Sequence, residues 1–293
     1  MAAAATAGSV REALGGAADA LAAMGVETPR LDAELLLAEA TGWSRARMAT
    51  EPELGVPAPA ARRFGEMVRR RLRREPVAYI LGRKGFRSIE LTVDRRVLIP
   101  RPETELLVEL ALELGPRRVL DIGTGSGAIA LAIAGELPSC EVIATDASRA
   151  ALEVASANAA RLGLAERVKL VEATLPPGLD ELDLIVANLP YVAESEWGDL
   201  EPEVTKWEPR QALLAGADGL DAIRGLLADR GRLLLPKAQQ KTTAGLVLAL
   251  EVGEGQAGAV AELMRGAGFG AIETRADLAG ILRVVIGRRD RSP

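Results

Sequence analysis

The sequence predicts an α/β domain with a largely parallel sheet, preceded by a small helical domain. From residue 102 onward, short apolar runs alternate with stretches of helical spacing, as expected of parallel strands joined by helices. A glycine-rich loop follows the first of these runs. Residues 1–75 show helical spacing only, and a chain of 293 residues is long enough for two domains.

Three helices are predicted in the helical domain, residues 1–75. Apolar side chains recur at helical spacing from residue 9 to residue 24. Thr28 and Pro29 are typical of an N-cap followed by proline at the first helical position, and this second helix should end near Gly42. The third predicted helix covers residues 59–74.

The third predicted helix is strongly basic. Seven arginines face two glutamates in and beside it, which gives a local net charge of +5. Such a charge run is either a solvated helix face or a docking surface for an acidic protein or for RNA. The arginines are Arg62, Arg63, Arg69, Arg70, Arg71, Arg73 and Arg74.

Residues 76–100 are predicted to form a hairpin that links the domains, because the pattern is strand-like from Tyr79 to Pro100. The α/β domain then spans residues 101–293. Its predicted helices are Glu103–Leu114, Ala128–Gly135, Arg149–Leu162 and Gly255–Gly266, and its predicted strands are Arg118–Ile122, Glu141–Thr145, Val168–Val171, Leu182–Ala187, Leu246–Val252 and Ile281–Ile286.

The composition excludes several kinds of site. The chain has no histidine and a single cysteine, Cys140, so a Ser-His triad, a histidine base, a disulfide within the chain and a cysteine metal cage are all excluded. The net charge of −5 argues against general nucleic-acid binding. No signal peptide and no apolar run of about 20 residues is evident, so we expect a cytoplasmic protein without a membrane span, and a monomer.

The glycine-rich loop predicts a cofactor site. Gly123, Gly125 and Gly127 lie between a strand and a helix, where glycine permits a tight turn and lets a ligand approach the backbone. Asp146 ends the next strand, where a carboxylate can accept both hydroxyls of a ribose. The loop alone fits NAD(P) as well as S-adenosylmethionine. Asp121 favours S-adenosylmethionine, since its charge would repel a pyrophosphate but suits an ammonium group.

Residues 188–191, Asn-Leu-Pro-Tyr, predict the acceptor site at the end of the fourth predicted strand. Asn188 offers an amide oxygen that can accept from an NH2 group, Pro190 contributes a carbonyl, and Tyr191 offers an aromatic face. The motif resembles the Asn-x-Pro-Tyr tetrapeptide of methyltransferases that act on a nitrogen conjugated to a π-system. In an open α/β sheet, ligands collect beyond the carboxyl ends of the strands, so both motifs should face one crevice.

Nearly the whole chain resembles the protein-(glutamine-N5) methyltransferases that modify class-1 peptide-chain release factors, the HemK/PrmC family. The block at Pro100–Glu105 is the most specific, because generic methyltransferases of this fold lack it. The other matching segments are Glu75–Gly82, Asp121–Gly127, Asn188–Tyr191, Glu208-Pro209, Ala212-Leu213, Asp218–Leu220, and Glu251–Gly253 with Gln256.

The resemblance implies a helical N-terminal domain, a hairpin linker and a seven-stranded class I S-adenosylmethionine-dependent methyltransferase domain. Because the helical domain contains the basic helix and no catalytic constellation, we expect it to serve substrate docking. The acceptor would be the glutamine of the Gly-Gly-Gln motif in release factors. Three departures stand out. Leu189 replaces the proline that is usual in the second slot of the tetrapeptide, residues 172–174 lack the usual Asp of the adenine pocket, and residues 233–245 read as an extra segment.

The expected chemistry is alignment of a weak nucleophile with an electrophilic methyl group. Asn188 Oδ1 and the Pro190 carbonyl would each accept one amide hydrogen, and Tyr191 would pack on the amide plane. Leu189 completes the predicted substrate-binding set. The predicted cofactor-binding set is Asp121, Gly123, Thr124, Gly125, Ser126, Gly127, Asp146 and Asn188.

Two other functions remain open from the sequence. Asn-Leu-Pro-Tyr is also the pattern of rRNA adenine-N6 dimethylases, so an adenine-N6 methyltransferase acting on RNA or DNA is the first alternative. The second is a non-catalytic protein that binds the cofactor, in which Leu189 or the extra segment has damaged the site. The net charge and the Pro100–Glu105 block argue against the first alternative.

Overall fold

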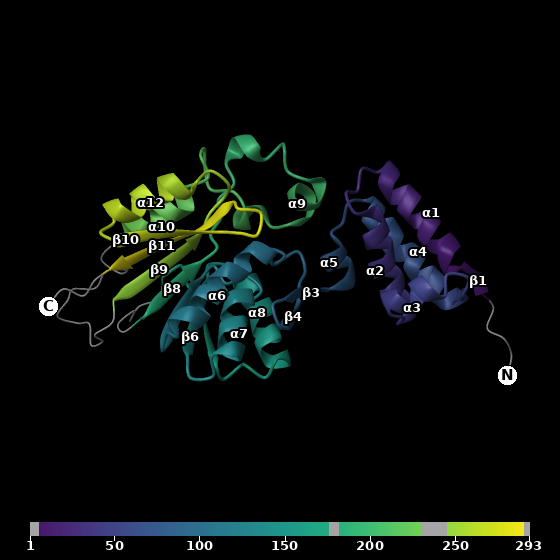
Figure 1. The fold of residues 1–293 in the computed structure, drawn as a ribbon, viewed down its shortest axis with the longest axis horizontal. Coiled ribbons are helices and arrows are strands. Elements are labelled where there is room, and N and C mark those ends of the chain that lie inside the picture. Colours follow the sequence, from purple (N-terminus) through teal and green to yellow (C-terminus); the bar gives the residue numbers. More distant parts are fainter. Residues whose placement is uncertain (1–5, 176–181, 230–244, 290–293) are drawn as a thin grey trace. The chain divides into compact units, whose positions relative to one another are not determined.

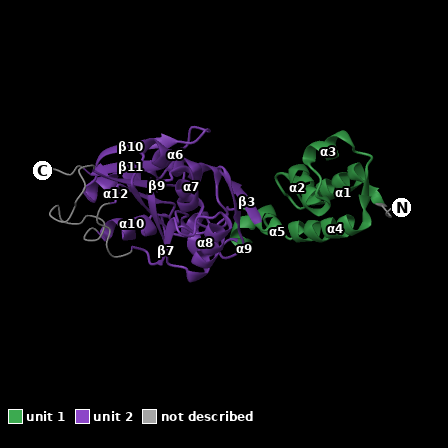
Figure 2. Cartoon of the chain, turned by 90° about the horizontal axis from the view of Figure 1, so that it is seen from below, with its two compact units in different colours: residues 1–82, 201–207 green, residues 83–200, 208–293 purple. Residues whose placement is uncertain are grey.

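The computed structural model describes residues 6–175, 182–229 and 245–289, and Figure 1 shows their fold. The chain forms two compact units (Figure 2). Unit 1 comprises residues 1–82 with 201–207, and unit 2 comprises residues 83–200 with 208–293. The predicted domain limits at residues 75 and 100 stay predictions.

Unit 1 is helical around its own apolar core. Ser9 and Glu12 form a capping box at the start of α1, and Gly42 ends α2 in the left-handed conformation. Leu14, Leu36 and Phe64 belong to the core that α1, α2 and α4 share. The elements are β1 (Thr6–Ser9), α1 (Val10–Ala23), α2 (Pro29–Thr41), α3 (Arg45–Thr50), β2 (Gly55–Pro57), α4 (Ala58–Leu72), α5 (Val77–Leu81) and α9 (Pro202–Trp207).

The predicted hairpin is only partly right. Residues 79–81, predicted as strand, lie in the helix α5, so that prediction is wrong. Pro76 fixes the backbone where this helix begins, and Gly82 ends it in the left-handed conformation. The prediction failed because an apolar run of five residues is too short to show a helical period. The hairpin itself is shorter, with β3 (Arg83–Phe86) paired to β4 (Ile89–Thr92), and residues 97–99 form no strand.

Part of the basic helix α4 holds unit 1 together instead of facing solvent. Arg71 is buried and pairs with Asp32 at 2.7 Å and with Glu203 at 2.6 Å. Arg74 also pairs with Glu203, at 2.6 Å, and Arg70 pairs with Glu75 at 2.7 Å. Glu203 lies on α9, so these ion pairs fix a segment that is distant in sequence onto the helices of unit 1.

Arg71→Ala should destabilise unit 1 by about 3–5 kcal/mol, because it leaves the buried carboxylate of Asp32 without its ion-pair partner, whereas Glu203 keeps its pair with Arg74. Arg69→Ala, on the exposed face of the same helix, should change stability by less than about 0.5 kcal/mol. Chemical denaturation of the full chain measures both. If both variants lose the same small amount of unfolding free energy, the buried ion pairs do not contribute to stability.

Unit 2 is built on a seven-stranded sheet in the order β10-β11-β9-β8-β5-β6-β7. Five strands run parallel, and the apolar faces of β5, β8 and β9 are buried on both sides. The elements are β5 (Arg118–Ile122), β6 (Glu141–Asp146), β7 (Val168–Glu172), β8 (Leu184–Ala187), β9 (Leu246–Glu251), β10 (Gly270–Ala276), β11 (Leu282–Arg289), α6 (Glu105–Leu114), α7 (Ala128–Glu136), α8 (Arg149–Arg161), α10 (Asp221–Ala228), α12 (Ala257–Gly266), and the 3₁₀ turns η1 (Pro102–Thr104), η2 (Glu194–Glu196) and η3 (Arg210–Ala212).

The residues alone indicated six of the seven strands. The missed strand, β10, lies at the sheet edge and has no buried residue, so it lacks the apolar run that marks the others. It pairs antiparallel with β11, and β11 pairs antiparallel with β9, so the sheet is mixed at this end. The predicted extra segment, residues 233–245, lies outside the described residues apart from Gly245. Within the described ranges, no helix is long and apolar enough to cross a membrane.

Candidate active site

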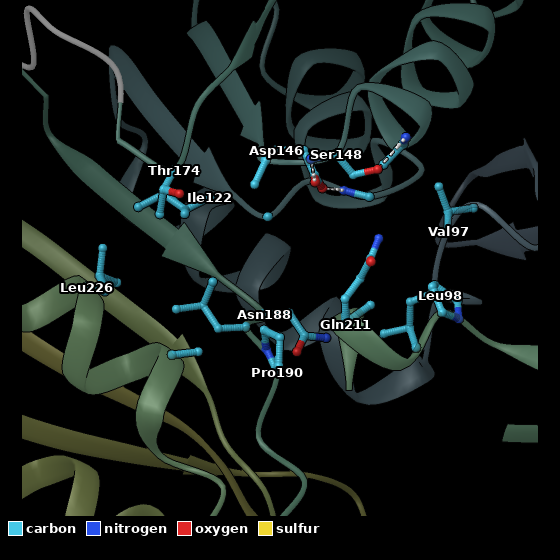
Figure 3. A pocket seen from close by; sticks show the side chains of 18 of the residues that line it. Val97, Leu98, Ile122, Asp146, Ser148, Thr174, Asn188, Pro190, Gln211 and Leu226 are labelled. Atoms are coloured by element: carbon cyan, nitrogen blue, oxygen red, sulfur yellow. Dashed lines mark hydrogen bonds between the residues drawn. The ribbon is translucent and has the colours of Figure 1, made fainter. Parts of the chain in front are cut away.

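A cavity of about 580 Å³ opens in unit 2 at the carboxyl ends of the parallel strands (Figure 3). The loop after β5 contributes Gly123, the end of β6 contributes Asp146, and the loop after β8 contributes Asn188 to its lining. Parallel strands present their carboxyl ends at one edge of the sheet, which is why these separate motifs meet. The expectation that the glycine loop and the Asn-x-Pro-Tyr motif face one crevice is therefore correct.

The glycine loop turns tightly and leaves space on its cavity side. Gly123, Gly125 and Gly127 all have positive φ, at 73°, 56° and 84°. No heavy atom lies within 4 Å of the position that a Cβ on Gly125 would take, whereas a Cβ on Gly127 would lie 2.8 Å from Leu131 Cδ1. Gly125 therefore offers open backbone to a ligand, and Gly127 is needed for close packing of α7.

Asp146 ties the glycine loop to the start of α8. Its Oδ2 accepts from the Gly125 N–H at 2.9 Å and its Oδ1 accepts from the Ser148 N–H at 2.8 Å. The carboxylate lines the cavity, where Figure 3 shows it across from Asn188. Each oxygen has a further lone pair, so the group can still accept hydroxyl hydrogens from a ligand.

Asp121 lies behind the loop and does not line the cavity. It is fully buried, and its Oδ2 accepts from the Thr124 hydroxyl at 2.6 Å and from the Ala130 N–H at 3.2 Å. Burial raises the pKa of Asp121 to about 7. The side chain thus holds the loop from beneath, and a direct contact with a ligand ammonium stays a prediction.

Thr124, Ser126 and Gly127 are likewise absent from the cavity lining. Thr124 and Ser126 are buried, at 6% and 2% exposure, and the Ser126 carbonyl accepts from Asn158 Nδ2 at 2.9 Å. These residues shape the loop, and only Gly123 and Gly125 of the predicted loop set reach the cavity.

Three residues of the tetrapeptide line the cavity, and the fourth does not. Asn188, Leu189 and Pro190 face it, and Leu189 Cδ2 lies 3.5 Å from the position that a Cβ on Gly123 would take. Leu189 thereby packs the acceptor motif against the glycine loop. Tyr191 lies beside the cavity, and its backbone carbonyl accepts from Gln256 Nε2 at 2.8 Å. Burial raises the pKa of the Tyr191 hydroxyl to about 12.

One wall of the cavity was not predicted from the sequence. Val97, Leu98 and Gln211 form this wall, and Leu226 of α10 lies on the opposite side (Figure 3). Glu208 fixes the wall, because its Oε2 accepts from the Ile99 N–H at 2.9 Å and its Oε1 accepts from Arg101. The resemblance included both Glu208-Pro209 and Pro100–Glu105. The contact between Glu208 and Arg101 shows how the two segments together hold this wall of the cavity.

Ala173 and Thr174 line the cavity at the position where the family usually has an adenine-pocket Asp. They offer a methyl group and a hydroxyl in place of a carboxylate. Together with Ile122 and Leu226 they give this end of the cavity an apolar character (Figure 3). Among the residues that the structure describes, no cluster of acidic or cysteine side chains could hold a metal ion.

Two family models match the chain, in the order of its two units. The PrmC N-terminal domain matches residues 12–82, and the methyltransferase small domain matches residues 102–203. A release factor glutamine methyltransferase from Caulobacter vibrioides is 41% identical over 277 residues, covering 92% of this chain and 93% of that protein. The chain belongs to the release factor glutamine methyltransferase family. Another relative of that name, from Moorella thermoacetica, is 45% identical over 267 residues, covering 89% of this chain and 91% of that protein.

A solved structure supports the fold. The hMettl16 catalytic domain in complex with MAT2A 3'UTR hairpin 6 has a TM-score of 0.51 and 17% identity, covering 69% of this chain and 76% of that one. At this identity the likeness shows a shared fold alone. The predicted class I methyltransferase fold with its seven-stranded sheet is confirmed, as are the enzyme class and S-adenosylmethionine as the methyl donor.

Proposed function

We propose that this enzyme transfers a methyl group from S-adenosylmethionine to the side-chain nitrogen N5 of the glutamine in the Gly-Gly-Gln motif of class-1 peptide-chain release factors. The observation that carries the proposal is one cavity that contains both Asp146 with the glycine loop and Asn188 with Pro190. The relatives named above, which carry that activity in their names, span the same two units.

The residues present fit the methyl donor. Gly125 presents open backbone, Asp146 presents a carboxylate with lone pairs to spare, and the apolar end of the cavity suits an adenine ring. We assign Gly123, Gly125 and Asp146 to the donor, with Asp121, Thr124, Ser126 and Gly127 supporting the loop. The donor supplies an electrophilic methyl group on a sulfonium centre.

The chain's part in the reaction is to hold the acceptor amide. Asn188 Oδ1 and the Pro190 carbonyl would each accept one N–H of the glutamine side chain, which orients the nitrogen lone pair and stabilises the positive charge that grows there. Tyr191 would flank the amide, and Leu189 would set the spacing from the loop. No strong base is required, because the nitrogen becomes acidic as it is methylated, and the chain has no histidine.

The deciding experiment is mass spectrometry of an intact release factor after incubation with enzyme and S-adenosylmethionine. A gain of one methyl group on the glutamine of the Gly-Gly-Gln peptide supports the proposal. Methylation of rRNA or DNA adenine in a parallel reaction, with an unmodified release factor, would favour the adenine-N6 alternative. Intact release factor should be used, because the helical unit 1 is expected to contribute to docking of the substrate.

We further propose that unit 1 docks the release factor through the exposed arginines of α4 and of its C-cap. Arg62, Arg69 and Arg73 are exposed, whereas Arg70, Arg71 and Arg74 are engaged within unit 1 and Arg63 pairs with Glu39 at 3.6 Å. The usable surface is therefore smaller than the local charge of +5 indicated. We also infer a cytoplasmic monomer that does not bind nucleic acid directly, in keeping with a protein substrate that acts in translation.

Replacing Arg62, Arg69 and Arg73 together with Ala should raise the KM for intact release factor several-fold and make it less salt-sensitive, with kcat unchanged. The control variant replaces Arg117 and Arg265, exposed arginines of unit 2. Steady-state kinetics at two salt concentrations test this. If the α4 variant and the control behave alike, the arginines are only a solvated helix face.

A further inference from the structure

Three polar residues from separate segments meet beside the cavity. Asn188 follows β8 and Glu251 ends β9, and the pairing of Ala187 with Leu250 places them next to each other at the ends of neighbouring strands. Thr104 comes from η1, in the most specific block of the sequence. Thr104 and Glu251 are buried, at 4% and 2% exposure, and neither lines the cavity.

A hydrogen-bonded chain joins the three side chains. Asn188 Nδ2 donates to Thr104 Oγ1 at 3.0 Å. The Glu251 carboxylate ends the neighbouring strand with its Oε2 buried and unpartnered among the described residues, and hydrogen bonding by Thr104 lowers the pKa of this carboxyl. An ionised carboxylate only accepts, so the Thr104 hydroxyl must donate its one hydrogen to Glu251. Thr104 can then only accept from Asn188, and the amide of Asn188 is forced to present Oδ1, not Nδ2, away from Thr104.

We propose that Thr104 and Glu251 are positioning residues that fix the side-chain amide of Asn188 with Oδ1 turned to accept the N–H of the substrate amide. The inference rests on the proposed role of Asn188. A flipped Asn188 would present a donor to the substrate NH2, which is itself a donor, so the orientation decides whether the acceptor can be held. It also assigns a function to Thr104 of the Pro100–Glu105 block, a residue that belongs to neither the cofactor loop nor the tetrapeptide.

The surroundings of Glu251 predict that the chain of hydrogen bonds is sensitive to pH. Burial raises the pKa of Glu251 to about 7, the neighbouring Glu103 raises it further, and Thr104, Arg283 and Arg101 act in the opposite direction. Tyr191 faces the same group. Below this pKa Glu251 carries a proton and can donate to Thr104, so the polarity of the chain is no longer imposed. We expect kcat to fall as the pH drops through about 7.

The test uses Thr104→Val and Glu251→Gln in the full-length enzyme, with intact release factor as substrate. Thr104→Val removes the hydroxyl at constant size and should lower kcat about five- to tenfold, with S-adenosylhomocysteine binding unchanged within twofold. Thr104→Ser restores the hydroxyl and should recover kcat to within about twofold. Glu251→Gln should also lower kcat and should remove the acid limb of the pH profile. Glu254→Gln, at an exposed position, is the matched control.

The outcomes separate this inference from the proposed function. If the wild-type enzyme does not methylate the release factor, the proposed function fails. If the wild type is active but Thr104→Val keeps full kcat, or Thr104→Ser fails to recover it, the positioning role is overturned. Asp121 also has a pKa near 7, so an acid limb that survives in Glu251→Gln is assigned to Asp121 and likewise contradicts the inference.

Discussion

Asn188→Ala should lower kcat by at least about a hundredfold while leaving donor affinity within a few fold. The residue lines the cavity and has the side-chain oxygen assigned to the acceptor amide, and Thr104 holds its nitrogen at 3.0 Å. Removing the side chain leaves the glycine loop and Asp146 in place, so donor binding has no reason to change. Turnover on release factor and calorimetry with S-adenosylhomocysteine measure the two effects separately.

Asn158, the other asparagine of the chain, is an instructive comparison. It is fully buried and joins Thr92 of β4 to the Ser126 carbonyl, with Nδ2 donating at 3.0 Å and 2.9 Å. Asn158→Ala should therefore lower the thermal midpoint, because it leaves buried backbone groups without partners. Asn188→Ala should leave that midpoint almost unchanged. Near-wild-type turnover in Asn188→Ala would remove the proposed mechanism.

The parallel part of the fold was predictable because its strands are buried on both faces. Val119, Ile185 and Leu248 lie in apolar runs bounded by polar or glycine residues, and such runs are visible without any three-dimensional information. The exposed edge strand β10 leaves no such trace. Residues 79–81 were misassigned for a related reason, since a single buried helical turn and a short strand have the same apolar residues.

The site was predictable where its chemistry is local in sequence. The backbone geometry of the glycine loop and of the tetrapeptide is determined by residues within each motif, and both motifs reach the cavity. The contacts that orient them join distant residues, such as Asn188 with Thr104 and Glu208 with Ile99. No periodicity or spacing encodes such pairs. For Asp121 the motif alone was misleading. Its place in the motif indicated a contact with the ligand, but the side chain is buried and its carboxylate accepts from Thr124.

Asp146→Ala should weaken donor binding by about ten- to a hundredfold, because a ribose diol would lose a charge-assisted acceptor worth about 1.5–3 kcal/mol. Part of the effect comes from the protein itself. The N–H groups of Gly125 and Ser148 lose the carboxylate that joins the glycine loop to α8, so the loop is less well ordered before the donor binds.

Asp146→Asn separates these two contributions. Its amide oxygen can still accept from one loop N–H, but its NH2 group meets the other N–H donor with the wrong polarity, and the ribose diol loses its charged acceptor. We expect this variant to recover some stability yet little donor affinity, if ribose binding dominates. Glu166→Ala, at an exposed carboxylate in the turn before β7, controls for the change in net charge. Calorimetric titration with S-adenosylhomocysteine gives the dissociation constants, and an unchanged value for Asp146→Ala would mean that the ribose is held elsewhere in the cavity.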